Sequence, residues 1–449
     1  MTAPGSIFVQ IPSYRDTQLM PTLVNMIKNA SDPSRLHAVV CWQHAADENI
    51  QDFIAAGFNF YSTSISNDRK IHLLSFNGCE ITLIDVDYLK TGGCGWARNV
   101  IQDYLRQENY SLQLDSHHRF IENWDTQLIT MLENLRFISA KPILTGYPAA
   151  YDPSDESTRV SGGALQMDFD RFSAPGVIHF KSSWVGNWRS RTMPIRARFI
   201  SGGFIFGDAS FVTDVPNDSN HFFSSEEISM TVRSYVAGYD LYHPHRILLW
   251  HYYTRPNEKK VWNDHNFERK ASGEISQDAE EKSSRAYQRT RALLGMTSDW
   301  NGDFGRFGLR SERSLEDYEL FAGISFRHEG VRQEVLDGVE PKDSLPLISY
   351  DEWEKDIICN TDVQIKITAD DFEIPISDCQ KISVRIHTAD ETEIYSHTLP
   401  SDAISELACG ATVEYVLNFA TSPFQKPKKY ILEALDKLNR ILETAHACL

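Results

Sequence analysis

Short apolar runs alternate with helix-like patterns through the first half of the chain, and this alternation constrains the fold more than any other feature. Strands that alternate with helices at this spacing predict a mainly parallel sheet with helices on both faces. Ligands of such sheets bind beyond the carboxyl ends of the strands, so polar clusters that follow strands should meet at one edge. The predicted strands are Ser6–Ile11, His37–Trp42, Glu80–Asp85 and Ser111–Asp115, and the predicted helices between them are Leu19–Asn29 and Ala97–Gln107.

The later part of the chain predicts further elements and a second domain. Phe199–Phe206 and His245–Trp250 are predicted strands, and Glu226–Ala237 is a predicted helix. Toward the C-terminus the pattern changes to short alternating strands, closed by an amphipathic helix at about 427–445. This change predicts a separate small β-rich domain. The expected bounds are 1–330 for the α/β domain, 331–354 for a linker and 355–449 for the β-rich domain.

The charge of the chain disfavours some classes of partner. The 449 residues include 62 Asp and Glu against 44 Lys and Arg, a formal net charge of −18. A negative surface of this size disfavours binding to nucleic acid and to anionic membranes. The N-terminal stretch lacks the features of a signal peptide, and no run reaches the roughly 20 apolar residues of a membrane span. With seven scattered cysteines and no CxxC pair, we expect a cytoplasmic protein without a disulfide framework.

A carboxylate and an imidazole stand two positions apart where the fourth predicted strand ends. Asp115 and His117 can face the same side of the chain there and hold one cation. Mixed oxygen and nitrogen ligands suit Mn²⁺ or a similar divalent ion such as Mg²⁺, which would neutralise a diphosphate. The alternative is a surface aspartate beside a capping serine, Ser116.

A glycine-rich turn opens the predicted helix at Ala97. Its glycines, Gly92, Gly93 and Gly95, allow the backbone to approach a ligand closely, and the start of a helix favours anions. Arg98 can reach a phosphate or a sugar hydroxyl from that position. The alternative is an ordinary strand-to-helix turn with a surface arginine. The segment is neither a GxGxxG fingerprint nor a Walker A loop, so dinucleotide and P-loop functions have no support.

The order of these motifs resembles one family of enzymes. The ordered set is IPSYRD after the first strand, GCGWARN at the helix, LDSH after the fourth strand, then SGGF, an EE helix and WHYYTR. Over about 7–326, including RSERSLEDYELFAGI at 310–324, the chain resembles glycosyltransferase family 60. These are the cytoplasmic UDP-GlcNAc:polypeptide hydroxyproline N-acetylglucosaminyltransferases and their bacterial relatives; the polypeptide GalNAc-transferases are more distantly similar. The resemblance implies a GT-A catalytic domain and retaining transfer from a UDP-sugar, and the C-terminal domain lies outside it.

The resemblance implies a metal site of three residues. Asp115 and His117 match the metal-binding Asp-x-His of this group, and His251 matches the histidine that completes the site from a later strand. His243 and His245 are rivals for that place. The alternative for His251 is a histidine packed in an aromatic strand end. The expected cofactor is Mn²⁺ or Mg²⁺.

The resemblance also implies residues around the donor sugar. Gly202 and Gly203 match a glycine pair whose backbone lies against the sugar and acceptor, although a β-bulge also explains them. Glu226 or Glu227 matches an acidic residue that contacts donor-sugar hydroxyls, and Arg98 matches an arginine that contacts the donor. The alternative for the acidic pair is a favourable first turn of a capped helix. The predicted catalytic residues are Arg98, Glu226 and Glu227.

The segment after the first strand is expected to hold the nucleoside. Tyr14 can pack near the uracil, while Ser13 and Asp16 can bond the base or ribose. The more distant relatives place an acidic residue after the second strand for uracil; Gln43 stands there in this chain and can substitute as a hydrogen-bond partner. The predicted substrate-binding residues are Pro12, Ser13, Tyr14, Arg15, Asp16, Gln43, Gly95, Arg98, Ser116, Gly202, Gly203 and Arg255.

The predicted activity is metal-dependent transfer of a sugar, expected to be GlcNAc, from UDP-GlcNAc to a hydroxyl of a polypeptide or glycan. One alternative is a transferase that uses another UDP-hexose to build a bacterial surface polysaccharide. Another is a catalytically inactive carbohydrate- or partner-binding protein of the same fold. The β-rich C-terminal domain suits acceptor docking or homo-oligomer formation. The acceptor, the donor sugar and the oligomeric state stay open at this level.

Overall fold

The computed structural model describes residues 5–159, 162–173 and 177–449, and the chain divides into two compact units. The first unit comprises Met1–Ala322 together with Gly338–Pro346, and the second comprises Gly323–Asp337 together with Leu347–Leu449. The chain therefore passes between the units more than once, in the region where the sequence predicted one linker. No helix of the described residues is long and apolar enough to cross a membrane.

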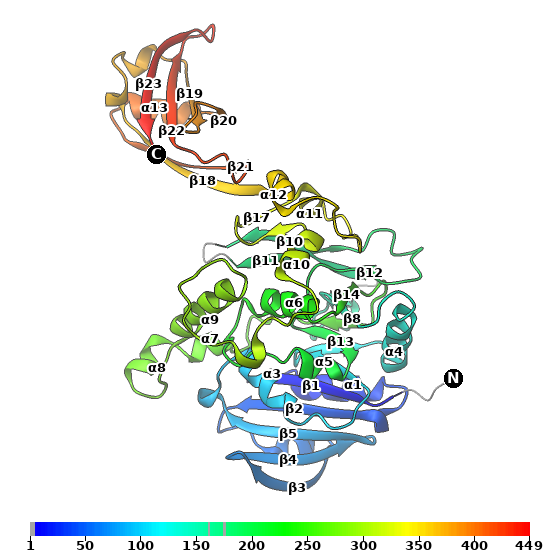
Figure 1. The fold of residues 1–449 in the computed structure, drawn as a ribbon. Coiled ribbons are helices and arrows are strands. Elements are labelled where there is room, and N and C mark those ends of the chain that lie inside the picture. The colour runs from blue at the N-terminus through cyan, green and yellow to red at the C-terminus, as the bar shows by residue number, and fades with distance from the viewer. Residues whose placement is uncertain (1–4, 160–161, 174–176) are drawn as a thin grey trace. The chain divides into compact units, whose positions relative to one another are not determined.

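A ten-stranded sheet forms the centre of the first unit, and its strand order can be followed in Figure 1. The order is β12-β14-β8-β13-β6-β1-β2-β5-β4-β3. The pairs β6–β1, β1–β2, β2–β5 and β14–β8 are parallel, whereas β13 and the β3–β4 edge pair with antiparallel neighbours. The structure thus confirms the predicted α/β fold, with a parallel centre to the sheet. The strands are β1 Ile7–Tyr14, β2 Leu36–His44, β3 Asn59–Ser66, β4 Arg69–Phe76, β5 Cys79–Asp87, β6 Tyr110–Leu114, β8 Pro142–Thr145, β12 Ile195–Arg196, β13 Phe204–Asp208 and β14 Asp240–His243.

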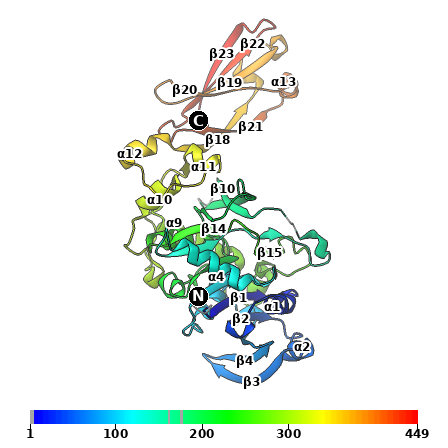
Figure 2. The same ribbon diagram turned by 90° about the vertical axis from the view of Figure 1, so that its right-hand side faces the viewer.

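Alternating buried side chains along β1 explain why helices cover both faces of this sheet. Val9 packs in a cluster with residues of α1 and α4, whereas Phe8, its neighbour in the strand, packs with residues of α3. Figure 2 shows α4 in front of β1 and β2. The helices of the unit are α1 Leu19–Lys28, α2 Ile50–Ala55, α3 Cys94–Gln102, α4 Trp124–Leu135, α5 Ser210–Asp214, α6 Glu226–Val236, α7 Val261–Asp264, α8 Phe267–Ala271, α9 Ala279–Leu293 and α10 Leu315–Ala322.

Two small sheets complete the first unit. The first has the order β7-β15-β9, and its antiparallel β7–β15 pair sets His251 opposite His118. This pairing brings the end of β15 beside the loop that follows β6, although more than a hundred residues separate them. The second small sheet is the antiparallel pair β10–β11. These strands are β7 His118–Phe120, β9 Ala149–Ala150, β15 Leu249–His251, β10 Leu165–Phe172 and β11 Ile178–Trp184.

Three of the predicted strands differ from the observed ones by three residues or more at one end. β1 continues through Pro12 to Tyr14, because the β1–β6 pairing stops at Gln10 and the missing N–H of the proline costs no hydrogen bond to β6. The strand predicted at 199–206 begins only at Phe204, since the glycine pair forms a turn. The strand predicted at 245–250 is the short β15 at Leu249–His251.

Two four-stranded sheets build the second unit, in the orders β16-β17-β18-β21 and β20-β19-β22-β23. Their shared core contains Ile365 of β18, Val384 of β19, Leu417 of β21 and Leu432 of β22. The structure therefore confirms a β-rich C-terminal region. The elements are β16 Ile324–Ser325, β17 Gly330–Val331, β18 Ile358–Ile367, β19 Lys381–His387, β20 Glu393–Thr398, β21 Val413–Thr421, β22 Lys429–Leu435 and β23 Ile441–Cys448, with α11 Gln333–Leu336, α12 Tyr350–Trp353 and α13 Ser401–Ala408.

The predicted closing helix at 427–445 is wrong. This segment forms the antiparallel hairpin of β22 and β23. Tyr430, Leu432 and Ala434 are buried at alternating positions of β22, which is the period of a strand and not of a helix. The turn between the two strands contains Asn439 at φ 57°, a left-handed conformation that asparagine adopts more readily than most residues.

Candidate active site

A cavity of about 420 Å³ opens where the carboxyl ends of β1 and β2 meet the loop after β6. Its wall also includes the starts of α3 and α6, the end of β15 and the loop that leads to α7. The location agrees with the rule that α/β sheets bind ligands beyond their strand ends. The predicted residues that line the cavity are Pro12, Tyr14, Gln43, Arg98, Asp115, Ser116, His117, Gly202, Gly203, Glu226, Glu227, His251 and Arg255.

Asp115, His117 and His251 converge in this cavity. Each offers one ligand atom, and these atoms all lie within 4.8 Å of one another. His251 Nε2 is 3.3 Å from Oδ2 of Asp115. One carboxylate and two imidazoles form a donor set that suits a divalent transition metal, so the residues present fit the metal that the resemblance implies.

The carboxylate of Asp16 lies behind the triad. It accepts hydrogen bonds from Nδ1 of His117 and from Oγ of Ser116, both at 2.6 Å, and a third from Arg255 at 3.2 Å. Burial alone would raise the pKa of Asp16, but His117, Ser116 and Arg255 together outweigh it and hold the pKa below its ordinary value. A carboxylate bonded to Nδ1 leaves Nε2 of the same imidazole for a metal. The sequence predicted that Asp16 bonds the base or ribose; in the structure its carboxylate bonds His117, Ser116 and Arg255.

The two rival histidines lie outside the triad. His243 uses both ring nitrogens, with Nδ1 at 2.9 Å from the carbonyl of Thr145 and Nε2 accepting from the backbone N–H of Met167. His245 Nε2 accepts a hydrogen bond from Arg246. Among the described residues, the group of metal-ligating side chains contains neither of them.

Burial keeps His251 neutral. Burial first and the neighbouring His117 second lower the pKa of His251, Asp115 opposes them, and the resulting pKa is about 4. An imidazole must be unprotonated to bind a metal. His251 is therefore in its ligand form throughout the neutral range.

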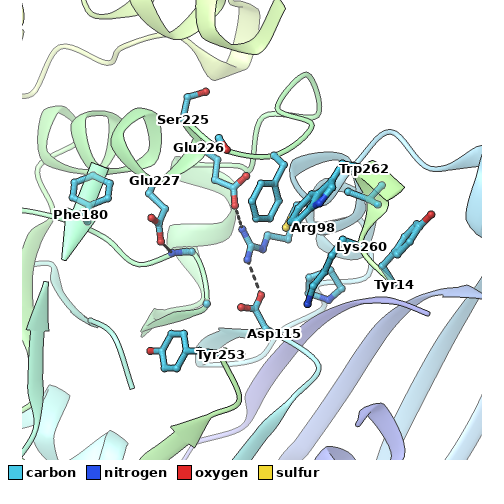
Figure 3. A pocket seen from close by; sticks show the side chains of 18 of the residues that line it. Tyr14, Arg98, Asp115, Phe180, Ser225, Glu226, Glu227, Tyr253, Lys260 and Trp262 are labelled. Atoms are coloured by element: carbon cyan, nitrogen blue, oxygen red, sulfur yellow. Dashed lines mark hydrogen bonds and ion pairs between the residues drawn. The ribbon is translucent and has the colours of Figure 1, made fainter. Parts of the chain in front are cut away.

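Arg98 bridges the metal triad and the acidic pair of α6 (Figure 3). Its terminal nitrogens donate to Oε1 of Glu226 at 2.8 Å and to Oδ1 of Asp115 at 3.0 Å, and only 2% of the arginine is exposed. A Cβ at Gly202 would come within 2.9 Å of Arg98, and one at Gly203 within 2.7 Å of Asp115. The glycine pair therefore leaves the space that this ion-pair network occupies.

The two glutamates of α6 differ in their partners. Glu227 accepts the backbone N–H of Gly202 at 2.8 Å and the hydroxyl of Tyr147 at 3.3 Å, and burial raises its pKa to about 7. Burial also raises the pKa of Glu226. Oε2 of Glu226 is buried and has no hydrogen-bond partner among the described residues. This oxygen is free to accept a hydroxyl from a ligand.

The other end of the cavity contains Tyr14 and Gln43. The hydroxyl of Tyr14 donates to Asp264 of α7 at 3.0 Å, and Arg15 donates to the same carboxylate at 2.9 Å. The side chain of Gln43 already bonds the carbonyl of Ser13 and the hydroxyl of Thr91. Its amide therefore supports the wall of the cavity more than it offers free groups to a base.

Four predicted substrate-binding residues do not line the cavity: Ser13, Arg15, Asp16 and Gly95. Gly95 instead packs against the chain before α6, where a Cβ would lie 2.5 Å from the carbonyl oxygen of Asp218. The glycine that the turn needs for its conformation is Gly93, with φ 102°.

Several cavity residues were missed in the sequence. Lys260 and Trp262 lie in a charged stretch in which no motif was recognised, and Tyr147 and Phe180 lie in segments without a motif. Figure 3 shows Tyr14, Lys260 and Trp262 on one side of Asp115, with Glu227, Phe180 and Tyr253 on the other. The position of Tyr253 inside WHYYTR, two residues after His251, was the one available signal.

The sheet, the cavity at its strand ends and the triad after β6 define a GT-A type nucleotide-sugar transferase fold. The chain belongs to the family described as "Glycosyltransferase (GlcNAc)", whose model matches residues 6–328. The resemblance to a glycosyltransferase is thus confirmed. No curated protein matches the sequence.

Solved structures are similar to the chain at low sequence identity. GalNAc-T7 with UDP, GalNAc and Mn²⁺ is 12% identical, with a TM-score of 0.46, over 68% of this chain and 56% of that one. The chain therefore matches little more than half of GalNAc-T7. S. aureus TarS is 12% identical, with a TM-score of 0.36, over 99% and 77% of the two chains. PcManGT, a mannosyltransferase from Pyrobaculum calidifontis in complex with GDP-Man and Mn²⁺, is 11% identical, with a TM-score of 0.33, over 57% and 59%.

Proposed function

We propose that this protein is a divalent-metal-dependent, retaining glycosyltransferase that moves N-acetylglucosamine from UDP-GlcNAc to a hydroxyl of a polypeptide or glycan. The observation that carries the proposal is the convergence of Asp115, His117 and His251 in the cavity of a chain from the GlcNAc glycosyltransferase family. The more specific assignment to glycosyltransferase family 60 is part of the proposal and rests on the ordered motifs.

The metal ligands would be Asp115, His117 and His251, and Mn²⁺ or Mg²⁺ would be the cofactor. A divalent ion at this place supplies positive charge to a diphosphate, which stabilises the leaving group. The chain prepares the site for it: Asp16 orients His117, and burial keeps His251 unprotonated.

The donor sugar would lie at the α6 end of the cavity. The unpartnered Oε2 of Glu226 would accept a sugar hydroxyl, and the backbone of Gly202 and Gly203 would lie against the ring. Arg98 and the Gly202 N–H hold the two glutamates as hydrogen-bond acceptors. We infer front-face transfer: the bond from sugar C1 to the β-phosphate oxygen breaks, and the acceptor oxygen bonds C1. The departing phosphate oxygen then takes the acceptor proton.

The first unit would carry out this reaction, and residues 355–449 would serve as an accessory domain for acceptor docking or homo-oligomer formation. A cytoplasmic location is supported by seven cysteines that form no disulfide.

A panel of sugar nucleotides tests the donor. Purified protein with Mn²⁺ is incubated with UDP-GlcNAc, UDP-GalNAc, UDP-Glc, UDP-Gal and GDP-Man, and release of the nucleoside diphosphate is measured. The fastest release is expected from UDP-GlcNAc. A faster reaction with another donor would overturn the sugar assignment, and no release from any donor, with or without acceptor peptides and glycans, would overturn the proposed activity.

A further inference from the structure

The positive side chains of the cavity are not equally available to a ligand. Arg98 is bound to two carboxylates, and Arg255 to the carboxylate of Asp16. Lys260 has no carboxylate within ion-pair distance among the described residues, although its side chain lines the cavity. Lys259 also lines the cavity but is exposed to solvent, whereas Lys260 is half-buried. Lys260 is therefore the partly buried cation of the cavity whose charge is not already neutralised.

The backbone fixes Lys260 relative to the strand ends. Lys260 immediately precedes α7, and its N–H donates to the side chain of Asn263 at 2.9 Å. The last residue of α7, Asp264, accepts hydrogen bonds from Tyr14 and Arg15 at the end of β1. A fixed backbone spares a ligand the cost of ordering the loop, so that only the lysine side chain has to be ordered on binding.

The surroundings of Lys260 favour the arrival of an anion. Burial and the nearby Arg255 lower the pKa of its ammonium, and together they outweigh the opposing effects of Asp16 and Glu258. Burial and Arg255 disfavour the charged form in the empty cavity, and an anionic ligand would reverse their effect. Figure 3 shows Lys260 on the Tyr14 side of Asp115, the side opposite to Glu227. The lysine thus lines the cavity on the side of Asp115 away from the end proposed for the sugar.

The negative charge that develops on the diphosphate during sugar transfer favours a further cation in the cavity. The diphosphate of an intact nucleoside-diphosphate sugar carries two negative charges, which a divalent ion balances. When the bond to the sugar breaks, its electron pair stays on the β-phosphate and a third negative charge develops. The two arginines are already committed to carboxylates, so the chain has to supply another cation for that charge.

We propose that Lys260 binds the diphosphate of the nucleotide and stabilises the charge that develops on the leaving phosphate. This inference rests on the proposed function, because it assumes a nucleoside-diphosphate sugar in the cavity. It assigns to Lys260 a phosphate contact of the kind that the sequence suggested for Arg98.

Binding of UDP and of uridine to the full chain with Mn²⁺ tests the assignment by calorimetry. Lys260→Met keeps the apolar stem and removes the charge, Lys260→Arg keeps the charge, and Lys28→Ala removes an exposed lysine of α1 outside the cavity. Loss of one charged contact should weaken UDP binding about 10–100-fold in Lys260→Met. Its affinity for uridine should not change. Lys260→Arg should recover most of the UDP affinity, and Lys28→Ala should bind UDP as the wild type does.

The outcomes separate this inference from the proposed function. If the wild type binds UDP and Lys260→Met binds it equally well, Lys260 does not contact the diphosphate, while the proposed function stands. If Lys260→Met loses uridine and UDP affinity to the same extent, the lysine supports the cavity wall and the inference is wrong. If the wild type binds neither ligand, the proposed function fails and the inference fails with it.

Discussion

The carboxylate of Asp16 lies 2.6 Å from Nδ1 of His117, and this contact ties the end of β1 to a residue 101 positions further along the chain. Both side chains are buried, and Ser116 and Arg255 complete the hydrogen bonds of the carboxylate. The contact fixes the ring of His117 so that its other nitrogen faces Asp115 and His251. The histidine is therefore prepared as a ligand before any metal binds.

Asp16→Asn should weaken metal binding without unfolding the protein. Asparagine retains the Oδ1 that accepts the backbone N–H of Gln18 just before α1. It no longer carries the negative charge that fixes His117. Losses of such outer contacts reduce metal affinity about 10–100-fold. Mn²⁺ titration followed by electron paramagnetic resonance measures this, with thermal unfolding as the check on the fold. Unchanged Mn²⁺ affinity in a folded variant would show that Asp16 does not orient the ligand.

Gly203→Ala should also reduce Mn²⁺ affinity, for a steric reason. The added Cβ would lie 2.7 Å from Oδ2 of Asp115, so the carboxylate has to move. We expect affinity to fall by about tenfold or more. Gly186→Ala is the matched control, because a Cβ there meets nothing within 4 Å, and it should bind Mn²⁺ normally. Equal affinities in the two variants would contradict the proposed geometry.

Arg98→Met should destabilise the metal-free protein by about 3 kcal/mol, because it leaves the partly buried carboxylates of Asp115 and Glu226 without their cation. Urea unfolding measures the difference in the free energy of unfolding. Adding Glu226→Gln to Arg98→Met removes one of the two carboxylates that have lost their cation. The double variant should recover part of the lost free energy of unfolding. If Arg98→Met is as stable as the wild type, the ion pairs of Arg98 contribute nothing to the free energy of unfolding.

The free energy of unfolding should depend on pH through Glu227. Burial raises the pKa of Glu227 from its ordinary value of about 4.5 to about 7, so the folded chain holds this proton more tightly than the unfolded chain. The stability linked to the protonated carboxyl is complete below about pH 4.5 and is lost as the pH rises through about 7. Glu227→Gln removes this dependence and should be more stable than the wild type by up to about 3 kcal/mol at pH 8.

Denaturant unfolding at pH 5 and pH 8 measures the free energy of unfolding of the wild type and of Glu227→Gln. The advantage of Glu227→Gln should shrink at the lower pH, where the wild-type carboxyl is protonated. An advantage that is equal at both values, or absent at pH 8, would show that Glu227 does not carry a raised pKa in the folded chain.

Local signals were sufficient for the parallel centre of the sheet and for the place of Asp115 and His117 at its edge. The apolar runs of β1, β2, β5 and β6 are buried on both faces and are readable as strands. Asp115 and His117 follow such a run directly, so their place at the strand ends follows from the sequence. His251 was found only through the resemblance, because its neighbourhood depends on the β7–β15 pairing.

The errors arise where long-range contacts outweigh local pattern. The hairpin of β22 and β23 has apolar residues that also suit a helix, and pairing with β19 decides the outcome. Asp16 follows β1 as a ligand-binding residue would, yet its partners come from the loop after β6 and from Arg255. The availability of Lys260 becomes visible only when the partners of the neighbouring arginines are known.

Metal-dependent release of UDP from UDP-GlcNAc tests the central claim most directly. Wild-type protein stripped with a chelator is assayed before and after addition of Mn²⁺. Asp115→Asn is assayed in the same way, once its unfolding temperature has been shown to match that of the wild type. The account predicts release by the wild type only with the metal, and none above background by the variant. Equal release with and without metal, or undiminished release by Asp115→Asn, would contradict the claim that Asp115, His117 and His251 hold the catalytic ion.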